Sequence, residues 1–175
     1  MLSILQLIVD TIATVLGGVL LLRFWMQAIR VRPPASVAQF TFTLSDWLVK
    51  PLRRIVPGAG GYDWASLIGA FLVVLLATSI LFIVGASAEQ VLLLALGRFV
   101  KWIIYGFIAL LIIEAIFSWV NPHAPLAPFV HALNDPLLRP IRKVVPPIGG
   151  LDLSVLVAVL LLQIALYLLR TVIPI

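Results

Sequence analysis

Four long runs of apolar residues dominate the pattern of the chain, and shorter segments that carry charged residues separate them. The runs extend from about Leu2 to Ile29, from Trp64 to Ala86, from about Val91 to Val120 and from about Leu151 to Arg170. Each run is long enough to cross the hydrocarbon core of a bilayer, which takes about 20 helical residues. The pattern therefore predicts an all-α integral membrane protein with four transmembrane helices.

The segments after the first and third runs are amphipathic. Apolar residues recur in them at spacings of three and four, which indicates a helix with one apolar face. They are Phe40, Leu44, Trp47, Leu48, Pro51, Leu52 and Ile55 in the first segment and Phe129, Leu133, Leu137, Ile141 and Val144 in the second. Because Lys and Arg lie mostly off these faces, we expect each helix to lie in the membrane interface with its cations among anionic lipid headgroups.

Both amphipathic segments carry a proline at corresponding places, Pro51 and Pro140. Proline removes a hydrogen bond within a helix, so a kink or break is expected at each. One interpretation is an interfacial helix with a simple bend. The alternative is a pair of re-entrant segments that meet at an axis between the two halves and line a polar site, because broken backbone inside a membrane is tolerated only beside protein or water.

The composition excludes several classes of function. Hydrophobic residues make up 63% of the chain and charged residues 11%, whereas a soluble domain is about half apolar and about a quarter charged. There is no cysteine, so disulfide scaffolds and thiolate metal sites are excluded. The net charge of +5 is explained by the positive-inside bias of membrane proteins, and we expect no nucleic-acid partner.

The chain is a tandem duplication. Residues 46–69 and 135–158 align at a constant offset of 89, with ten of 24 positions identical. The shared positions include Pro51, Arg53, Pro57, Gly60, Gly61 and Asp63 in the first copy and Pro140, Arg142, Pro146, Gly149, Gly150 and Asp152 in the second. We divide the chain into repeats at 1–88 and 89–175, each with two spans and an amphipathic segment. Because each repeat crosses the membrane twice, the two have the same orientation and are parallel repeats.

Most cations lie on one side of this topology. The connecting segments hold Arg30, Arg32, Lys50, Arg53, Arg54, Arg139, Arg142 and Lys143, whereas the opposite helix ends hold Arg98, Lys101 and Arg170. The positive-inside rule then predicts cytoplasmic connecting segments and termini on the outside.

Tryptophan and glycine give further packing signals. Trp25, Trp47, Trp64, Trp102 and Trp119 are expected to act as interfacial anchors, because indole rings favour the boundary between headgroups and acyl chains. Trp102 and Trp119 are separated by about 25 Å of helix, close to the hydrocarbon thickness of about 30 Å, and so are expected to bracket the third span. Gly17 and Gly18 predict a close approach of another helix to the first span.

Two pairs of charged residues stand out beside or within the spans. Asp63 and Asp152 each follow Gly-Gly and precede a span, where a carboxylate caps a helix, and a salt bridge back to Arg53 or Arg142 would fix the turn. Arg23 and Glu114 occupy corresponding places in the first and third runs, allowing for a two-residue difference. We expect an ion pair between them across the repeat interface. The alternatives are a cation site at Glu114 and an Arg23 side chain that reaches the interface alone.

No catalytic constellation is recognisable. The only histidines, His123 and His131, are too far apart to form a helical metal-ligand pair, and His131 and Asp135 fit a surface pair with no nucleophile beside them. No phosphate-binding loop or haem-attachment motif is present in the sequence. We therefore expect no enzymatic activity, no cofactor and no metal.

The repeated motif resembles the YggT (YlmG) family. It reads Pro-[Leu/Ile]-Arg-[Arg/Lys], then Pro, Gly-Gly and Asp at the start of a span, with Asn121-Pro122 after the third run. The resemblance covers essentially the whole chain and implies a small multi-pass protein of the bacterial inner membrane. It also implies loose associations with osmotic or ionic stress tolerance and with cell division or nucleoid distribution, and in plastids with cytochrome assembly or organelle division. In the first repeat Arg30-Val31 stands roughly at the Asn-Pro place and Trp47 replaces Pro136, so a role that depends on an Asn-Pro turn does not carry over to the first copy.

Two functional hypotheses follow. The first is a non-enzymatic accessory protein that supports membrane-protein assembly or envelope homeostasis, with a role in osmotic or ionic stress tolerance. Because so small a bundle exposes nearly all its helices, this protein is expected to form a homo-oligomer or to join a larger membrane-protein partner. The alternative is a small potassium or sodium permeation or transport component built around Glu114 and Arg23. Its predicted pathway is rich in positive charge, which would repel cations.

Overall fold

The computed structural model describes residues 2–145 and 152–173 and is α-helical throughout, with no strand in these ranges. Its elements are α1 (Leu2–Ala28), α2 (Ala35–Ile55), α3 (Trp64–Thr78), the 3-10 helix η1 (Ser79–Val84), α4 (Ala88–Val120), α5 (Ala127–Arg142) and α6 (Leu153–Val172). Four stretches, 4–28, 64–83, 88–120 and 153–172, are long and apolar enough to cross a membrane. The predicted all-α, four-span fold is confirmed. Pro146, Gly149 and Gly150 lie outside the described residues.

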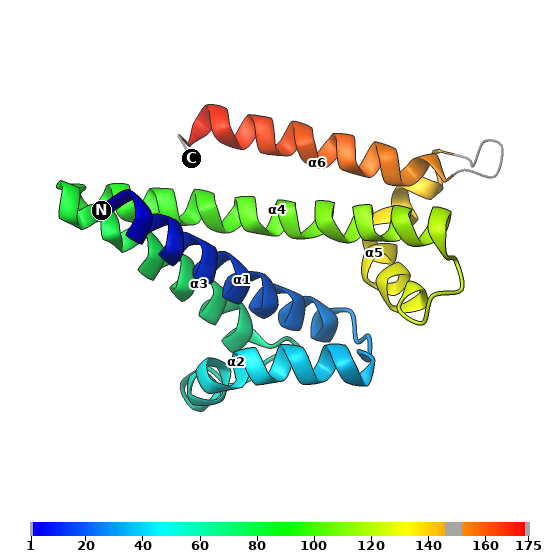
Figure 1. Cartoon of the computed structure of the whole chain (residues 1–175), viewed down its shortest axis with the longest axis horizontal. Coiled ribbons are helices and arrows are strands. Elements are labelled where there is room, and N and C mark those ends of the chain that lie inside the picture. Colours follow the sequence, from blue (N-terminus) through cyan, green and yellow to red (C-terminus); the bar gives the residue numbers. More distant parts are fainter. Residues whose placement is uncertain (1, 146–151, 174–175) are drawn as a thin grey trace.

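The two halves have the same topology and direction. In Figure 1, α1 and α4 begin at the end of the bundle where both termini lie, and α3 and α6 run back toward that end. The connecting helices α2 and α5 join the opposite ends of these spans. At the far end, Gly85 adopts a left-handed φ of 85° after η1, and a capping box between Ser87 and Gln90 starts α4. The predicted parallel repeats are therefore confirmed.

Each half has its own small core, built at matching positions. In the first half Leu20 of α1 and Val49 of α2 are buried together, and Gly69 of α3 approaches Leu20, Leu48 and Leu52. In the second half the buried cluster contains Leu111, Leu138 and Ala158. Equivalent residues of the two cores are 91 positions apart in the first span of each half and 89 positions apart in the connecting helix and the returning span. This matches the two-residue difference expected from the sequence. Each connecting helix thus packs against the two spans of its own half.

The buried faces of the connecting helices overlap the predicted apolar faces only in part. Leu133 of α5 is buried as that face predicts, and Leu48, Leu52, Leu137 and Ile141 pack against the two cores. The sequence did not single out the buried Thr41, Ser45 and Val49 of α2 or the equivalent Val130, Asn134 and Leu138 of α5. The small side chains of Thr41 and Ser45 let α2 approach the spans closely, while Trp47 and Ile55 of its predicted face are exposed.

The prolines do not interrupt these helices. Pro51 lies inside α2, and Pro136 and Pro140 lie inside α5. The expectation of broken segments that meet at a common axis is therefore wrong, because α2 packs against α1 and α3 whereas α5 packs against α4 and α6. A proline in a short amphipathic helix that lies beside the bundle leaves one carbonyl without its helical partner, and that is tolerated where the helix borders solvent or headgroups.

Contacts of α4 with α1 and α3 join the halves. Gly17 of α1 lies against the Trp102 ring, so that a Cβ on Gly17 would lie 2.2 Å from its Cζ3 atom. The Trp25 indole packs edge-on against Phe107 at 5.0 Å and donates a hydrogen bond of 2.9 Å to the Leu133 carbonyl. Trp25 and Trp102 are only partly buried, so these contacts add a packing role and the predicted anchor role stays a prediction. The Trp102 ring fits beside α1 because Gly17 opposite it has no side chain.

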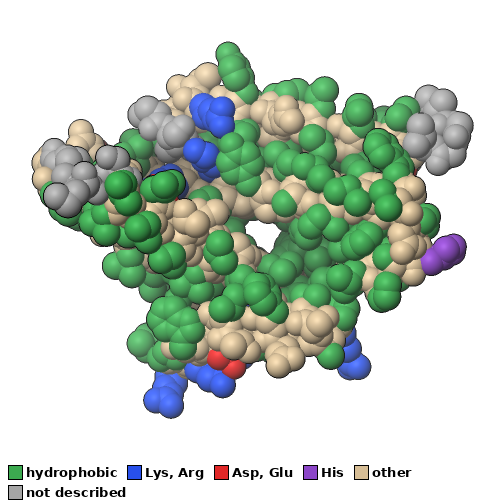
Figure 2. Space-filling model, viewed as in Figure 1, with side chains coloured by type: hydrophobic (Ala, Val, Ile, Leu, Met, Phe, Trp, Pro, Cys, Tyr) green, Lys and Arg blue, Asp and Glu red, His purple; other side chains and the backbone are tan. Residues whose placement is uncertain are grey.

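The other three tryptophans are exposed, as expected for interfacial anchors. Trp119 is at the end of α4 and Trp102 lies well inside this helix, and the bracketing of the third span by these two rings stays a prediction. A second link between the halves lies toward the end that bears the termini, where Arg98 of α4 pairs with Asp10 of α1 and donates a hydrogen bond to Thr78. Figure 2 shows hydrophobic side chains over most of one face, with Lys and Arg near its edges.

Gly17 and Gly18 provide a matched test of the contact between the halves. Gly17→Ala is expected to lower the free energy of unfolding by about 1–3 kcal/mol, because the new methyl group overlaps the Trp102 ring. Gly18→Ala meets no atom within 4 Å and is expected to raise stability by roughly 0.5–1 kcal/mol through helix propensity. Thermal unfolding in detergent measures both. Equal effects of the two substitutions would contradict the packing.

Candidate functional sites at the connecting helices

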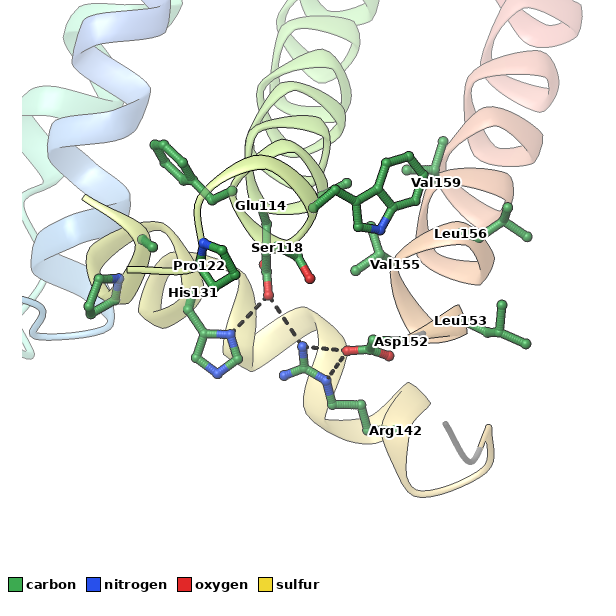
Figure 3. A pocket seen from close by; sticks show the side chains of 15 residues that line it. Glu114, Ser118, Pro122, His131, Arg142, Asp152, Leu153, Val155, Leu156 and Val159 are labelled. Atoms are coloured by element: carbon green, nitrogen blue, oxygen red, sulfur yellow. Dashed lines mark hydrogen bonds and ion pairs between the residues drawn. The ribbon is translucent and has the colours of Figure 1, made fainter. Parts of the chain in front are cut away.

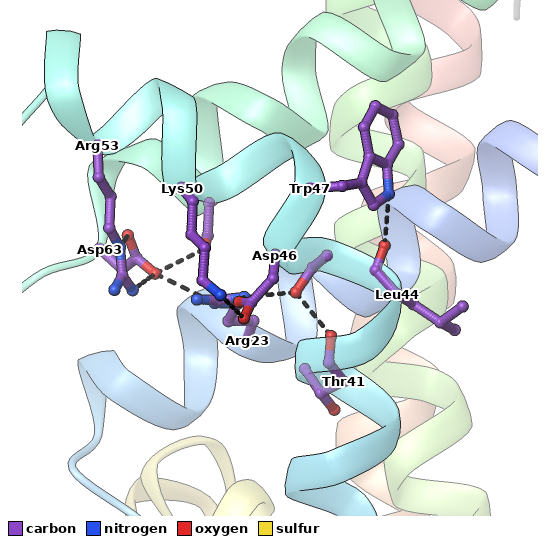
Figure 4. Close-up of polar contacts among 10 residues, drawn as sticks. Arg23, Thr41, Leu44, Asp46, Trp47, Lys50, Arg53 and Asp63 are labelled. Atoms are coloured by element: carbon purple, nitrogen blue, oxygen red, sulfur yellow. Dashed lines mark hydrogen bonds and ion pairs between the residues drawn. The ribbon is translucent and has the colours of Figure 1, made fainter.

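The first half closes around an ion cluster formed by Arg23, Asp46, Lys50, Arg53 and Asp63, which we call the first-half cluster. Arg23 reaches from α1 to Asp46 at 2.7 Å and to Asp63 at 3.6 Å, and it also donates a hydrogen bond of 2.6 Å to Ser45. Figure 4 shows Arg23 between α2 and the start of α3. The guanidinium is buried and its Cζ lies 4.8 Å from the centre of the Phe42 ring. Three elements are therefore held by one cation.

The aspartates of this cluster are kept ionised by their partners. Hydrogen bonds from Lys50 and Arg23 lower the pKa of Asp46 below its ordinary value. Burial alone would raise the pKa of Asp63, but hydrogen bonds from Arg53 and Ser66 and the nearby guanidinium charges outweigh burial and lower it. The hydrogen bond to Asp63 in turn raises the pKa of Arg53. The cluster is thus stabilised in its fully charged form.

The second half has an equivalent group, the second-half cluster, formed by Glu114, His131, Asp135, Arg139, Arg142 and Asp152. Arg142 of α5 binds Asp152 at 2.7 Å and Glu114 of α4 at 3.3 Å. His131 Nδ1 lies 2.9 Å from Glu114 Oε1. Figure 3 shows Glu114, His131 and Arg142 converging from α4 and α5. Burial would raise the pKa of Asp152, but hydrogen bonds from Arg142 and Ser154 outweigh it and lower the pKa.

The two clusters share a framework and differ at one charge. The contacts Arg53–Asp63 and Lys50–Asp46 reappear as Arg142–Asp152 and Arg139–Asp135 at an offset of 89. The third contact differs, because Arg23 in the first half is replaced by Glu114 in the second. Phe42, which packs on Arg23, is likewise replaced by His131, which contacts Glu114.

The predicted ion pair between Arg23 and Glu114 is wrong. Arg23 pairs with Asp46 and Asp63, whereas Glu114 pairs with Arg142 and His131. The physical reason is proximity, because each connecting helix packs on its own half and presents opposite charges within reach of its own span. The expectation that His131 pairs with Asp135 at the surface is also wrong, since His131 contacts Glu114. The signal available in the sequence was the repeat itself, which aligns His131 with Phe42.

Both predicted salt bridges to the turn aspartates are present, whereas a side-chain cap to a backbone amide is present at Asp152 and not at Asp63. Asp63 and Asp152 occupy the N-cap positions of α3 and α6, and Asp152 accepts a hydrogen bond of 3.0 Å from the Ser154 amide. Asp63 instead accepts one from the Ser66 hydroxyl at 2.6 Å. Gly60 and Gly61 have φ values of 67° and 84°, a region that glycine adopts at low cost. Arg53 and Arg142 then fix the two turns by binding these aspartates.

Cavities lie beside both clusters. A cavity of about 440 Å³ borders the first-half cluster, and one of about 800 Å³ borders the second-half cluster between α4, α5 and α6. In the described residues, no three His, Asp or Glu side chains are grouped so that they could hold a metal ion. The arrangement is suited to binding a polar or charged group at the membrane interface.

Comparison with known families assigns the chain. The model of the CCB3/YggT family matches residues 1–84 and 93–173, which together are nearly the whole chain. The chain belongs to the CCB3/YggT family. The two matched regions are consistent with two tandem copies, and each contains one of the ion clusters.

Relatives in this family share about a third of their residues with the chain. The uncharacterized protein YggT of Escherichia coli strain K12 is 33% identical over 91% of this chain and 86% of its own. An uncharacterized protein of Vibrio alginolyticus is 32% identical over 97% and 95%, and one of Pseudomonas aeruginosa is 36% identical over 89% and 83%. No solved structure matches the chain. The architecture described above therefore rests on the structure of this CCB3/YggT chain alone.

The stabilisation that the first-half cluster gives the folded protein is expected to be lost at low pH. Since the pKa of Asp63 is lowered in the folded state, its stabilisation is complete above the unfolded value of about 3.9 and is lost as the pH falls through the lower folded value. Asp63→Asn is expected to lower stability by roughly 1–3 kcal/mol at pH 7 and to flatten the decline between about pH 5 and 2.

Thermal unfolding of the detergent-solubilised protein across this pH range measures the effect. Lys50→Gln is the control, because Lys50 is 73% exposed and its pair with Asp46 is worth less than about 1 kcal/mol. If the stability of Asp63→Asn declined with pH in the same way as that of the wild type, the Asp63 carboxylate would not be the group that holds the turn.

Proposed function

We propose that this protein is a non-enzymatic accessory protein of the bacterial inner membrane that supports membrane-protein assembly or envelope homeostasis under osmotic or ionic stress. The observation that carries the proposal is the division between charged and apolar surfaces. The ionised side chains of both clusters are paired within their own halves, whereas long apolar helix faces stay uncovered. Such faces suit contact with the spans of another membrane protein or of a second copy of the chain.

The exposed residues of α1 form one such face. Ile4, Ile8, Ile12 and Val15 recur at spacings of three and four and are all more than half exposed. On α6, Leu156, Leu160, Ile164 and Leu168 repeat the pattern at the opposite edge of the bundle. We place the connecting helices in the cytoplasm, because α2 and α5 carry the excess of Lys and Arg.

Site-specific photocrosslinking in living cells tests the accessory role. A photoreactive residue at the exposed Ile12 is expected to give discrete protein adducts whose yield rises after an osmotic upshift. The same residue at the buried Val74 should give none. Deletion of the gene is expected to slow growth at high salt. Lipid adducts alone at Ile12, together with normal growth of the deletion strain at high salt, would contradict the proposal.

Cation permeation is the second candidate, and the buried carboxylate of Glu114 inside α4 is the observation that favours it. Glu114 is the one buried carboxylate within the described spans, it is already bound by Arg142 and His131, and a single acidic side chain is a thin basis for an ion pathway. We therefore expect proteoliposomes to show no potassium or sodium flux above that of liposomes without protein. Flux that is abolished by Glu114→Gln would make permeation the better description of the function.

A further inference from the structure

We infer that the second half carries a binding site for a phospholipid with a primary ammonium headgroup, such as an ethanolamine phospholipid. The site is the cavity of about 800 Å³ between α4, α5 and α6, a volume in the range of known ligand pockets. Figure 3 shows that it has a polar end and an apolar wall. Glu114, His131, Arg142 and Asp152 form the polar end, and Trp119, Val155, Leu156 and Val159 contribute to the wall.

Glu114 is the first reason to expect a cationic ligand. This residue lines the cavity and is only 9% exposed. Its Oε1 atom contacts His131 and Arg142, whereas its Oε2 atom is buried without a hydrogen-bond partner among the described residues. A buried carboxylate oxygen without a donor is costly, and a ligand that brings N–H donors would remove that cost after a small side-chain shift.

The comparison of the two halves gives the second reason. In the first-half cluster three cations face two carboxylates, and Arg23 links both aspartates. In the second-half cluster three carboxylates face two arginines, so the carboxylates outnumber the arginines by one. A ligand ammonium beside Glu114 and Asp152 would supply the cation that Arg23 supplies in the first half. The framework around the site is otherwise the same.

The surroundings identify the ligand as a lipid. The cavity lies where α4 ends and α6 begins, which is the level of the connecting helices, and Trp119 and Leu156 at its wall are 74% and 65% exposed. Acyl chains can therefore follow the apolar wall while the headgroup enters the polar end. Arg142 Nη1 makes no hydrogen bond among the described residues and lies 3.9 Å from Asp135 Oδ1, so its N–H groups can bind the phosphate.

The chemistry of the site discriminates among headgroups. An ethanolamine ammonium offers three N–H donors to Glu114 and Asp152, whereas a choline headgroup offers none. A phosphatidylglycerol headgroup would bring a negatively charged phosphate and hydroxyl groups, without a cation, to the polar end of the cavity. The carboxylates of the second-half cluster already outnumber its arginines. The expected preference is therefore ethanolamine over choline and glycerol lipids of the same chain length, by about tenfold to a hundredfold in affinity.

Native mass spectrometry of the purified full-length protein, titrated with these three lipids, tests the inference. Glu114→Gln is expected to remove the preference for the ethanolamine lipid. Glu89→Gln, which makes the same change in the exposed first turn of α4, should preserve it. Leu156→Trp narrows the cavity without touching the charges and should weaken binding of all three lipids. Thermal unfolding shows whether each variant is folded. If Glu114→Gln does not fold, Leu156→Trp is the variant that tests the cavity.

Two results would overturn the inference. Equal affinity for the ethanolamine and choline lipids, or an unchanged preference in Glu114→Gln, would show that Glu114 does not bind an ammonium group. Soluble phosphoethanolamine distinguishes the source of the headgroup. It is expected to bind at least about tenfold more weakly than the lipid, because it lacks the chains that contact the apolar wall. Equal affinity would show that the site takes a soluble amine and not a membrane lipid.

Discussion

The contact between an arginine near the end of a connecting helix and the aspartate before the next span holds each half of this protein together. Arg53 binds Asp63, and Arg142 binds Asp152, with the same spacing of ten residues. The aspartate sits at the N-terminus of a span, where the helix dipole also favours negative charge. Without this contact the connecting helix would be tied to the returning span only by weak apolar packing, because lipid solvates apolar surfaces as well as protein does. Polar contacts therefore decide where α2 and α5 lie.

The same constraint explains why Arg23 and Glu114 can exist inside spans. A charged group buried in a membrane protein needs partners close at hand, and the connecting helices provide them. Arg23 meets Asp46 of α2, and Glu114 meets Arg142 of α5. Each half thus provides partners for its own buried charge, and the contact between the halves relies on shape together with the ion pair of Arg98 and Asp10. Gly17 against Trp102 and the Trp25 ring against Phe107 provide the matching shapes.

Much of the architecture could be predicted from the sequence, because apolar run length and an internal repeat report directly on spans and topology. The partners of Arg23 and Glu114 could not. Sequence spacing places Arg23 and Glu114 at equivalent sites. It does not reveal that Arg23 lies closer to α2, and Glu114 closer to α5, than the two residues lie to each other. The contacts of Trp25 and Trp102 with the opposite half could not be predicted for a similar reason. The apolar pattern does not reveal that Phe107 lies against Trp25 or that Gly17 lies against Trp102.

The duplication separates structural and binding roles between two copies of one framework. In the first half the cation that links the aspartates belongs to the chain, so the cluster is complete and rigid. In the second half a carboxylate stands in that place, with His131 where Phe42 covers Arg23. The shared arginine–aspartate contact keeps the fold of the second half intact while its third charge is reversed. The first half retains its own cation at this place, and it packs against the second half through contacts of α4 with α1 and α3, so the altered cluster can serve recognition at the membrane interface.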